Sequence, residues 1–100
     1  MVQINVPYDR IADFCRKWKV SELALFGSVL SLDDFRPNSD VDVLVSFSPD
    51  AGWSLFDFVD MQDDLKAIFC REIDMVEKET LRNPFRRKHI LEHNEVIYAA

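Results

Sequence analysis

The sequence predicts a protein of the α/β (α+β) class, in which helices pack on a small mixed β-sheet. Two observations support this class. Apolar residues at helical spacing alternate along the chain with short runs rich in β-branched residues. The chain has 100 residues, of which 48% are hydrophobic, and this is enough for one modest core. Residues 1–100 are therefore expected to form a single domain.

The first half of the chain predicts one helix and two strands. An apolar helical face runs along residues 8–19 and consists of Ile11, Phe14, Cys15 and Trp18. The segment "SELALF" (21–26) is typical of a short buried strand, and a turn follows it. "DVDVLVSF" (40–47) is rich in β-branched residues and predicts the clearest strand. The loop before it ends in turn formers, "PNS".

The second half predicts a long helix, a third strand and a final helix. Residues 53–69 carry apolar side chains at near-helical spacing, with acidic residues on the other side. "REIDMVEK" (71–78) predicts the strand. Residues 79–84 connect it to a helix that begins at Pro84 and ends near His93. "EVIYAA" (95–100) predicts either a last short strand or a tail.

The charge of the chain argues against broad, non-specific binding to nucleic acids. The formal net charge is −6 and the pI is near 4.7, whereas such binding needs a cationic face. One short basic cluster contains Arg82, Arg86, Arg87 and Lys88, and it lies close to Glu92 and Glu95 in the sequence. We interpret this cluster as a solvated helix face in preference to a phosphate or partner patch.

The sequence also indicates the cellular location of the protein and the state of its two cysteines. No apolar run approaches the roughly 20 residues of a membrane span, and "MVQINVPYDR" lacks the charged-then-apolar order of a signal peptide. We therefore expect a cytoplasmic protein with no membrane partner. Cys15 and Cys70 are far apart and have apolar neighbours, which favours two buried free thiols over a disulfide or a metal pair.

Three aspartates fall in predicted strands, which normally exclude this residue. Asp40 and Asp42 are two positions apart, so they share one face of their strand with α-carbons about 7 Å apart. Like charges about 4 Å apart repel by on the order of 4 kcal/mol at an effective dielectric near 20, so a converging pair favours a cation. Mg²⁺ suits carboxylates combined with substrate phosphates. Asp74 completes an acidic cluster if its strand lies beside residues 40–42.

Gly27 and Ser28 suggest a phosphate contact. Gly27 can adopt backbone angles forbidden to other residues and lets a phosphate approach the chain, while Ser28 offers an N–H and a hydroxyl. Structural explanations compete: a serine cap at a strand-to-helix turn, an aspartate that caps a turn, and charges at a sheet edge that discourage aggregation. The combination of Gly-Ser after a strand with three strand aspartates favours a nucleotide and metal site.

The segments "LFGSVLSLDDFRPNSDVDVLV" and "EIDMVEKETLR" resemble the minimal nucleotidyltransferases of the polymerase-β superfamily, in particular the antitoxins of HEPN/MNT toxin–antitoxin pairs. The resemblance implies a polymerase-β-like nucleotidyltransferase fold. It assigns nucleotide binding to Gly27 and Ser28. It assigns the catalytic metal site to Asp40, Asp42 and Asp74, of which Asp74 also helps to activate the attacking hydroxyl.

The resemblance also implies a reaction and a partner. Two Mg²⁺ ions and ATP are expected, with in-line attack on the α-phosphate and release of pyrophosphate. The acceptor in such pairs is a tyrosine of the HEPN ribonuclease toxin, which transfer of AMP silences. A hetero-oligomer with that toxin is therefore expected, without direct contact to nucleic acid. Trp53, Leu55 and Phe56 are candidates for the partner surface, although core packing is expected for at least two of them.

Alternatives to this enzyme remain. The family commonly has an Ala-Arg-Gly-type stretch after Gly-Ser, whereas this chain has "VLSL" (29–32), which bears on nucleotide affinity more than on metal chemistry. That departure favours an antitoxin that neutralises its toxin by stoichiometric binding alone. An enzyme that modifies a small molecule would use the same chemistry, but such enzymes carry an additional substrate domain that this chain lacks. "HILEH" matches an inverted zinc-protease helix without an evident third ligand, so we expect its two histidines to face solvent.

Overall fold

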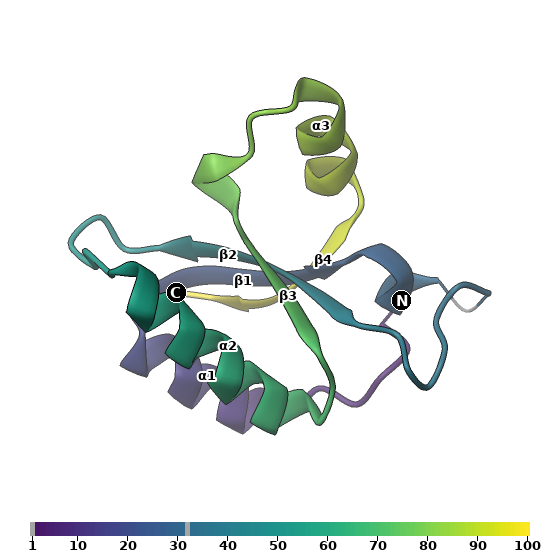
Figure 1. The fold of residues 1–100 in the computed structure, drawn as a ribbon, viewed down its shortest axis with the longest axis horizontal. Coiled ribbons are helices and arrows are strands. Elements are labelled where there is room, and N and C mark those ends of the chain that lie inside the picture. The colour runs from purple at the N-terminus through teal and green to yellow at the C-terminus, as the bar shows by residue number, and fades with distance from the viewer. Residues whose placement is uncertain (1, 32) are drawn as a thin grey trace.

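A computed structural model describes residues 2–31 and 33–100. The chain folds into a four-stranded sheet with the order β3-β2-β1-β4. Helices α1 and α2 lie on one side of the sheet and α3 on the other (Figure 1). The elements, in chain order, are α1 (Tyr8–Lys17), β1 (Val20–Phe26), the 3₁₀-helix η1 (Gly27–Leu30), β2 (Val41–Phe47), α2 (Leu55–Phe69), β3 (Ile73–Glu77), the 3₁₀-helix η2 (Lys78–Thr80), α3 (Pro84–Glu92) and β4 (Asn94–Ala99).

The sheet is mixed, as predicted. β1 pairs with β2 and with β4 in antiparallel fashion, and β2 pairs with β3 in parallel. A parallel pair needs a long crossover connection, which α2 supplies. "EVIYAA", for which two outcomes were open, belongs to the edge strand β4. The predicted helices and strands are all present, with boundaries that differ by about two residues.

The larger core lies between the sheet and the two helices α1 and α2. Alternate residues of β2 point into it, namely Val41, Val43 and Val45, and all three are fully buried. They meet α1 and α2 through the apolar stripes of those helices, which contain Ile11, Phe14, Cys15, Met61, Leu65 and Phe69. The apolar face of β2, with a period of two residues, therefore packs against the apolar faces of α1 and α2, which have helical spacing.

A smaller core fills the opposite face of the sheet, below α3. Its buried members are Ala24, Phe26, Leu44, Leu81 and Ile90. Ile90 is the one buried residue of α3, so this helix rests on the sheet through a narrow contact. Asn83 caps α3 by accepting hydrogen bonds from the backbone N–H groups of Phe85 and Arg86, and Pro84 occupies the first turn as predicted.

Helix α2 begins and ends with clear signals. Ser54 and Asp57 form a capping box at its start, where the Ser54 N–H donates to the Asp57 carboxylate at 2.8 Å. Cys70 ends the helix in the left-handed conformation, with φ of 55°. Both cysteines are free, as predicted, but Cys70 is exposed and only Cys15 is buried. The expectation of two buried thiols is wrong for Cys70, which is the C-cap residue after Phe69, the last buried residue of α2.

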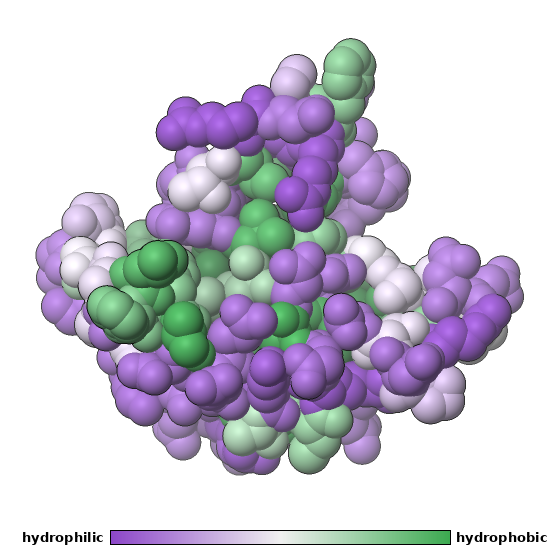
Figure 2. Space-filling view, in the orientation of Figure 1, coloured by the Kyte–Doolittle hydropathy of each residue, from purple (hydrophilic) through white to green (hydrophobic). Residues whose placement is uncertain are grey.

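The first turn of α2 also extends beyond the core. Leu55 and Phe56 are 80% and 83% exposed, and Figure 2 shows apolar side chains gathered over this end of the helix. Trp53 is half-buried. Its ring lies edge-on to that of Trp18, with 5.1 Å between the two ring centroids. Core packing was expected for at least two of these three residues. Only Trp53 packs against the core, so this expectation is wrong for Leu55 and Phe56. None of the helices in the described part of the chain is long and apolar enough to cross a membrane.

Candidate active site

The register of three strands brings the predicted site residues to one end of the sheet. Asp42 is paired with Phe26 of β1 on one side and with Asp74 of β3 on the other. Neighbouring strands are about 4.8 Å apart, so the Asp42 and Asp74 side chains project next to each other. Both lie on the face that α3 covers, since Leu44, two residues beyond Asp42, belongs to the smaller core.

The electrostatics of Asp42 reflect this crowding. The pKa of Asp42 is raised to about 6, first by burial and then by the negative charges of Asp74 and Asp40. A hydrogen bond with the Asp74 side chain raises it further, while the positive charge of Arg86 lowers it. The charges of Asp40 and Asp74 therefore both act on the Asp42 carboxylate.

Asp40 precedes β2 and is exposed, so its position depends on the loop that carries it. The Arg71 guanidinium holds this loop by donating to the backbone carbonyls of Pro37 at 2.8 Å and Ser39 at 3.4 Å. The Val41 N–H donates to the Glu72 carbonyl at 2.9 Å, which fixes the start of β2 against β3. Arg71 and Glu72, which directly precede β3, thus position the loop that carries Asp40.

Gly27 directly follows β1 and lies against Asp42. Its φ is +76°, which favours glycine, and a Cβ at this position would collide with the Asp42 carboxylate oxygen Oδ2. Ser28 is half-buried in the 3₁₀-helix η1, where its carbonyl accepts from the Ser31 N–H at 2.9 Å. The missing side chain therefore leaves room for the Asp42 carboxylate, which lies directly against the Gly-Ser turn.

A cavity of about 460 Å³ opens beside the Gly-Ser turn. Its walls consist of Gly27, Ser28, Leu30, Ser31, Asp34, His89 and His93. The two histidines are exposed, as predicted for solvent-facing residues, but they also line this cavity. Sequence reasoning missed that connection. The available signal was the i, i+4 spacing, which places both rings on one face of the helix.

Arg86 is a second residue of α3 that bears on the site. It was interpreted as part of a solvated helix face, and it is exposed. Its charge nevertheless acts on the Asp42 carboxylate, because α3 stands above this end of the sheet (Figure 1). Arg86 and His89 are three residues apart and therefore lie on neighbouring parts of one helix face.

The donor set of the site suits Mg²⁺ when a phosphate ligand is included. Within residues 2–31 and 33–100, no group of three or more His, Cys, Asp and Glu side chains is arranged to hold a metal ion by itself. Mg²⁺ is usually held by one or two carboxylates together with substrate phosphates and water. Asp42 and Asp74, which influence each other's charge, supply such a pair, and Gly27 lies directly against Asp42.

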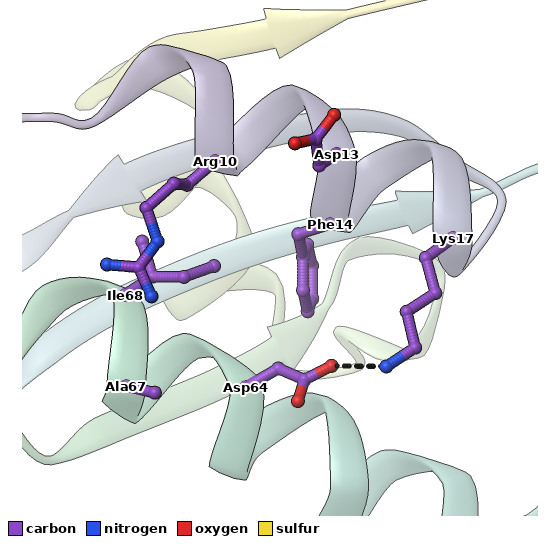
Figure 3. Close-up of a pocket in the computed structure, with 7 residues that line it drawn as sticks. All are labelled: Arg10, Asp13, Phe14, Lys17, Asp64, Ala67 and Ile68. Atoms are coloured by element: carbon purple, nitrogen blue, oxygen red, sulfur yellow. Dashed lines mark hydrogen bonds and ion pairs between the residues drawn. The ribbon is translucent and has the colours of Figure 1, made fainter.

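A second hollow, of about 280 Å³, lies on the other face of the sheet between α1 and α2 (Figure 3). Asp64 projects into it from α2 and bonds to Lys17 of α1 at 3.0 Å. The Asp64 carboxylate also accepts a hydrogen bond from the Trp18 indole N–H at 2.9 Å. This hollow is a seam between two helices, remote from the strand ends that carry Asp42 and Asp74.

Comparisons of sequence identify relatives of this chain. The family model described as "Nucleotidyltransferase domain" matches residues 9–97. A Methanocaldococcus jannaschii protein, named a candidate protein adenylyltransferase, is 33% identical over 84 residues, which cover 82% of this chain and 79% of the relative. Protein adenylyltransferase MntA of Thermococcus cleftensis is 29% identical over 82% of this chain and 77% of its own length.

Comparisons of structure find the same fold. A toxin–antitoxin crystal structure with AMP-PNP superposes with a TM-score of 0.72 and 17% identity, over 94% of this chain and 74% of that one. The complex of a tri-AMPylated Shewanella oneidensis HEPN toxin with an MNT antitoxin gives a TM-score of 0.64 and 14% identity, over 93% and 70% of the two chains. The predicted fold class is confirmed by these likenesses and by the mixed sheet.

Proposed function

The chain belongs to the nucleotidyltransferase domain family, and we propose that it transfers AMP from ATP to a tyrosine hydroxyl of a HEPN-type toxin and thereby neutralises the toxin. The observation that carries this proposal is the convergence of Gly27, Asp42 and Asp74 at one end of the sheet. The relatives named protein adenylyltransferases and the AMPylated toxin in a complex of the same fold support the choice of AMP and of a toxin.

Nucleotide binding is assigned to Gly27 and Ser28. Because Gly27 has no Cβ, its backbone lies directly against the Asp42 carboxylate, and a phosphate that contacts the Gly-Ser turn would therefore lie close to a proposed metal ligand. Ser28 lines the same cavity, and its hydroxyl can donate a hydrogen bond to a phosphate oxygen. The positive charge of Arg86 near Asp42 offsets part of the negative charge that a nucleotide brings.

Metal binding is assigned to Asp40, Asp42 and Asp74. Two Mg²⁺ ions held by these carboxylates and by the phosphates would offset the negative charge that develops on the attacking and leaving oxygens. The carboxylates repel one another without a cation, and this repulsion favours cation binding over the bare site. Arg71 contributes indirectly because it holds the loop that carries Asp40.

The transfer step is a displacement at phosphorus. The tyrosine oxygen forms a bond to the α-phosphorus of ATP, and the bond from that phosphorus to the bridging oxygen of the β-phosphate breaks. Pyrophosphate leaves with the bonding electrons. Asp74 helps to activate the tyrosine hydroxyl by accepting its proton. Positioning and electrostatic stabilisation supply most of the rate in such transfers.

Neutralisation by binding alone is the second candidate function. The "VLSL" sequence after Gly27-Ser28 favours it, because Val29 is fully buried and Leu30 packs against the larger core. These residues contribute apolar contacts there and no cation for a phosphate. Leu32 lies outside the described residues.

The intact mass of the toxin distinguishes the two functions. A co-expressed HEPN-type neighbour is incubated with this protein and MgATP, beside an Asp40→Asn/Asp42→Asn control. A gain in whole AMP units that the double variant does not produce is the expected result. An unchanged mass, with a tight complex in both samples, would contradict AMP transfer and leave neutralisation by binding.

A further inference from the structure

We propose that the imidazoles of His89 and His93 bind the polyphosphate tail of the nucleotide from the α3 side of the Gly-Ser cavity. This inference rests on the proposed function, because it extends the same nucleotide site. It assigns a binding role to a helix face on which sequence reasoning placed only solvent-facing residues. Three observations support it: the strand register, the lining of the cavity and the arrangement of the two rings.

The strand register places the histidines beside the Gly-Ser turn. Phe26, the last residue of β1, is paired with Asp42 on one side and with Asn94, the first residue of β4, on the other. His93 directly precedes Asn94, and Gly27 directly follows Phe26. Because the two strands are antiparallel, the end of α3 and the start of η1 must lie next to each other.

Two further contacts hold the end of α3 in this place. Ile90, between the two histidines in sequence, is buried in the smaller core with Phe26. The Asn94 side chain donates hydrogen bonds to the carbonyls of Ile90 and Leu91, at 3.0 and 3.1 Å. The histidines are therefore presented to the cavity by a fixed helix end.

The two rings are ordered relative to each other. They stack with centroids 4.5 Å apart and an angle of 24° between their planes. The Nδ1 of His93 lies 2.9 Å from the His89 carbonyl oxygen. A carbonyl oxygen only accepts, so this Nδ1 carries the hydrogen and donates. The Nε2 of His93 is then the ring nitrogen that donates a hydrogen bond to a phosphate oxygen when the imidazole is protonated.

The charges of the cavity lining point to an anionic ligand at the histidines. In the described part of the lining, these two residues are the side chains that can carry positive charge. Asp34 also lines the cavity and is exposed, so it adds a negative charge at the solvent side. A polyphosphate that enters this cavity beside Gly27 and Ser28 would be within the same lining as the two imidazoles. The volume of about 460 Å³ lies within the range of small-molecule sites.

Calorimetric titration of three proteins tests this inference. The wild type is compared with His89→Gln/His93→Gln and with Arg87→Gln/Lys88→Gln, which removes two positive charges from the same helix away from the cavity. Each protein is titrated with MgATP, magnesium tripolyphosphate and adenosine. We expect the histidine variant to bind MgATP and tripolyphosphate at least about tenfold more weakly and adenosine unchanged. The matched control is expected to change by less than about twofold.

Several outcomes would overturn the inference, and each has a different meaning. Equal affinity of the histidine variant and the wild type for tripolyphosphate removes the imidazoles from the phosphate site. An equal loss for adenosine would mean that they stack on the base. A loss that appears only when Zn²⁺ is added would mean that the pair binds a transition metal. If the wild type binds neither MgATP nor tripolyphosphate, both this inference and the proposed function fail. The other outcomes overturn the inference alone.

A conservative pair of substitutions separates charge from structure. His89→Lys/His93→Lys keeps positive charge at both positions and removes the rings, and we expect it to recover most of the tripolyphosphate affinity. Circular dichroism checks that all variants are folded. If the lysine variant binds as weakly as the glutamine variant, the charge is not what the site uses and the inference is overturned.

Discussion

Asp42 and Asp74 are direct partners in the parallel register of β2 and β3, on the sheet face that α3 covers. This pairing sets two carboxylates side by side where burial already raises the pKa of Asp42. The charges of Asp74 and Asp40 make the ionised form of Asp42 less favourable when no cation offsets them. The arrangement therefore has a measurable cost in the absence of a cation.

We expect Asp42→Asn to stabilise the metal-free protein at pH 7.5. The pKa of Asp42 is about 6 in the folded state, above its ordinary value of 3.8. The folded state then binds the proton more readily, so this group favours folding below about pH 4 and loses that contribution as the pH rises through 6. Asparagine avoids the loss, and about 1 kcal/mol is expected after allowance for solvent screening.

Thermal unfolding in a chelating buffer measures this effect. The melting temperature of Asp42→Asn should exceed that of the wild type by a few degrees at pH 7.5 and match it near pH 4. A variant that melts lower than the wild type at pH 7.5 would show that burial and the neighbouring carboxylates do not make the ionised Asp42 unfavourable for folding.

We expect Gly27→Ala to reduce both stability and MgATP binding. Its Cβ would meet the Asp42 oxygen, and the φ of +76° is itself unfavourable for alanine. Gly52→Ala is the matched control, since Gly52 has φ of +61° and nothing within 4 Å of an added Cβ. Denaturant unfolding should show a loss of about 1 kcal/mol for Gly52→Ala and a clearly larger one for Gly27→Ala. Equal losses would mean that Asp42 moves aside without cost.

The strands and helices were predictable because their patterns are local. The buried valines of β2 alternate with Asp42 and Leu44, and the apolar stripe of α1 has helical spacing, so each segment carries its own signal. The three aspartates and Gly27-Ser28 were recognisable for the same reason. β4 stayed open because an edge strand such as "EVIYAA" has only one buried residue, Ile97, and little apolar pattern.

The parts that sequence reasoning missed depend on tertiary placement. Arg86, His89 and His93 form an ordinary exposed helix face until the pairing of Phe26 with Asn94 sets that helix beside the site. Leu55 and Phe56 continue the apolar spacing of α2, yet no part of the larger core lies beneath them. Spacing tells which face of a helix is apolar, and only packing tells how much of that face is covered.

We expect Asp64→Asn to lower stability slightly at neutral pH. Burial would raise the pKa of Asp64, but hydrogen bonds from Trp18 and Lys17 more than offset it, so the pKa lies below its ordinary value. The contribution to stability is then present above about pH 4 and is lost as the pH falls through the lowered pKa. A loss of about 0.5 kcal/mol at pH 7 fits an exposed ion pair.

Urea unfolding at pH 7 and at pH 2.5 tests the sign of that effect. The difference between Asp64→Asn and the wild type should shrink at the lower pH. Asp63→Asn serves as the control because Asp63 is an exposed neighbour on the same helix. A difference that is unchanged between the two pH values would assign the effect to packing at Trp18 instead of to charge.

The exposed start of α2 is the surface at which we expect the toxin to dock. Leu55, Phe56 and Val59 are 80%, 83% and 56% exposed and form one apolar patch, part of the apolar surface in Figure 2. The exposed Asp60 and Asp63 continue along the same helix, so the patch suits a partner with an apolar centre and a basic rim. Leu55→Ser/Phe56→Ser should weaken the complex with the toxin at least about tenfold and leave MgATP binding unchanged.

Phe85→Ser is the matched control for this surface, because Phe85 is 85% exposed on α3, across the sheet from α2. Affinities measured by calorimetry should fall for the α2 variant alone, and the wild-type affinity should decrease with salt, since the rim charges are screened. A loss of toxin binding in Phe85→Ser with none in the α2 variant would move the docking surface to α3. In that case the toxin would approach directly over the cavity that His89 and His93 line, and toxin and nucleotide affinity would change together.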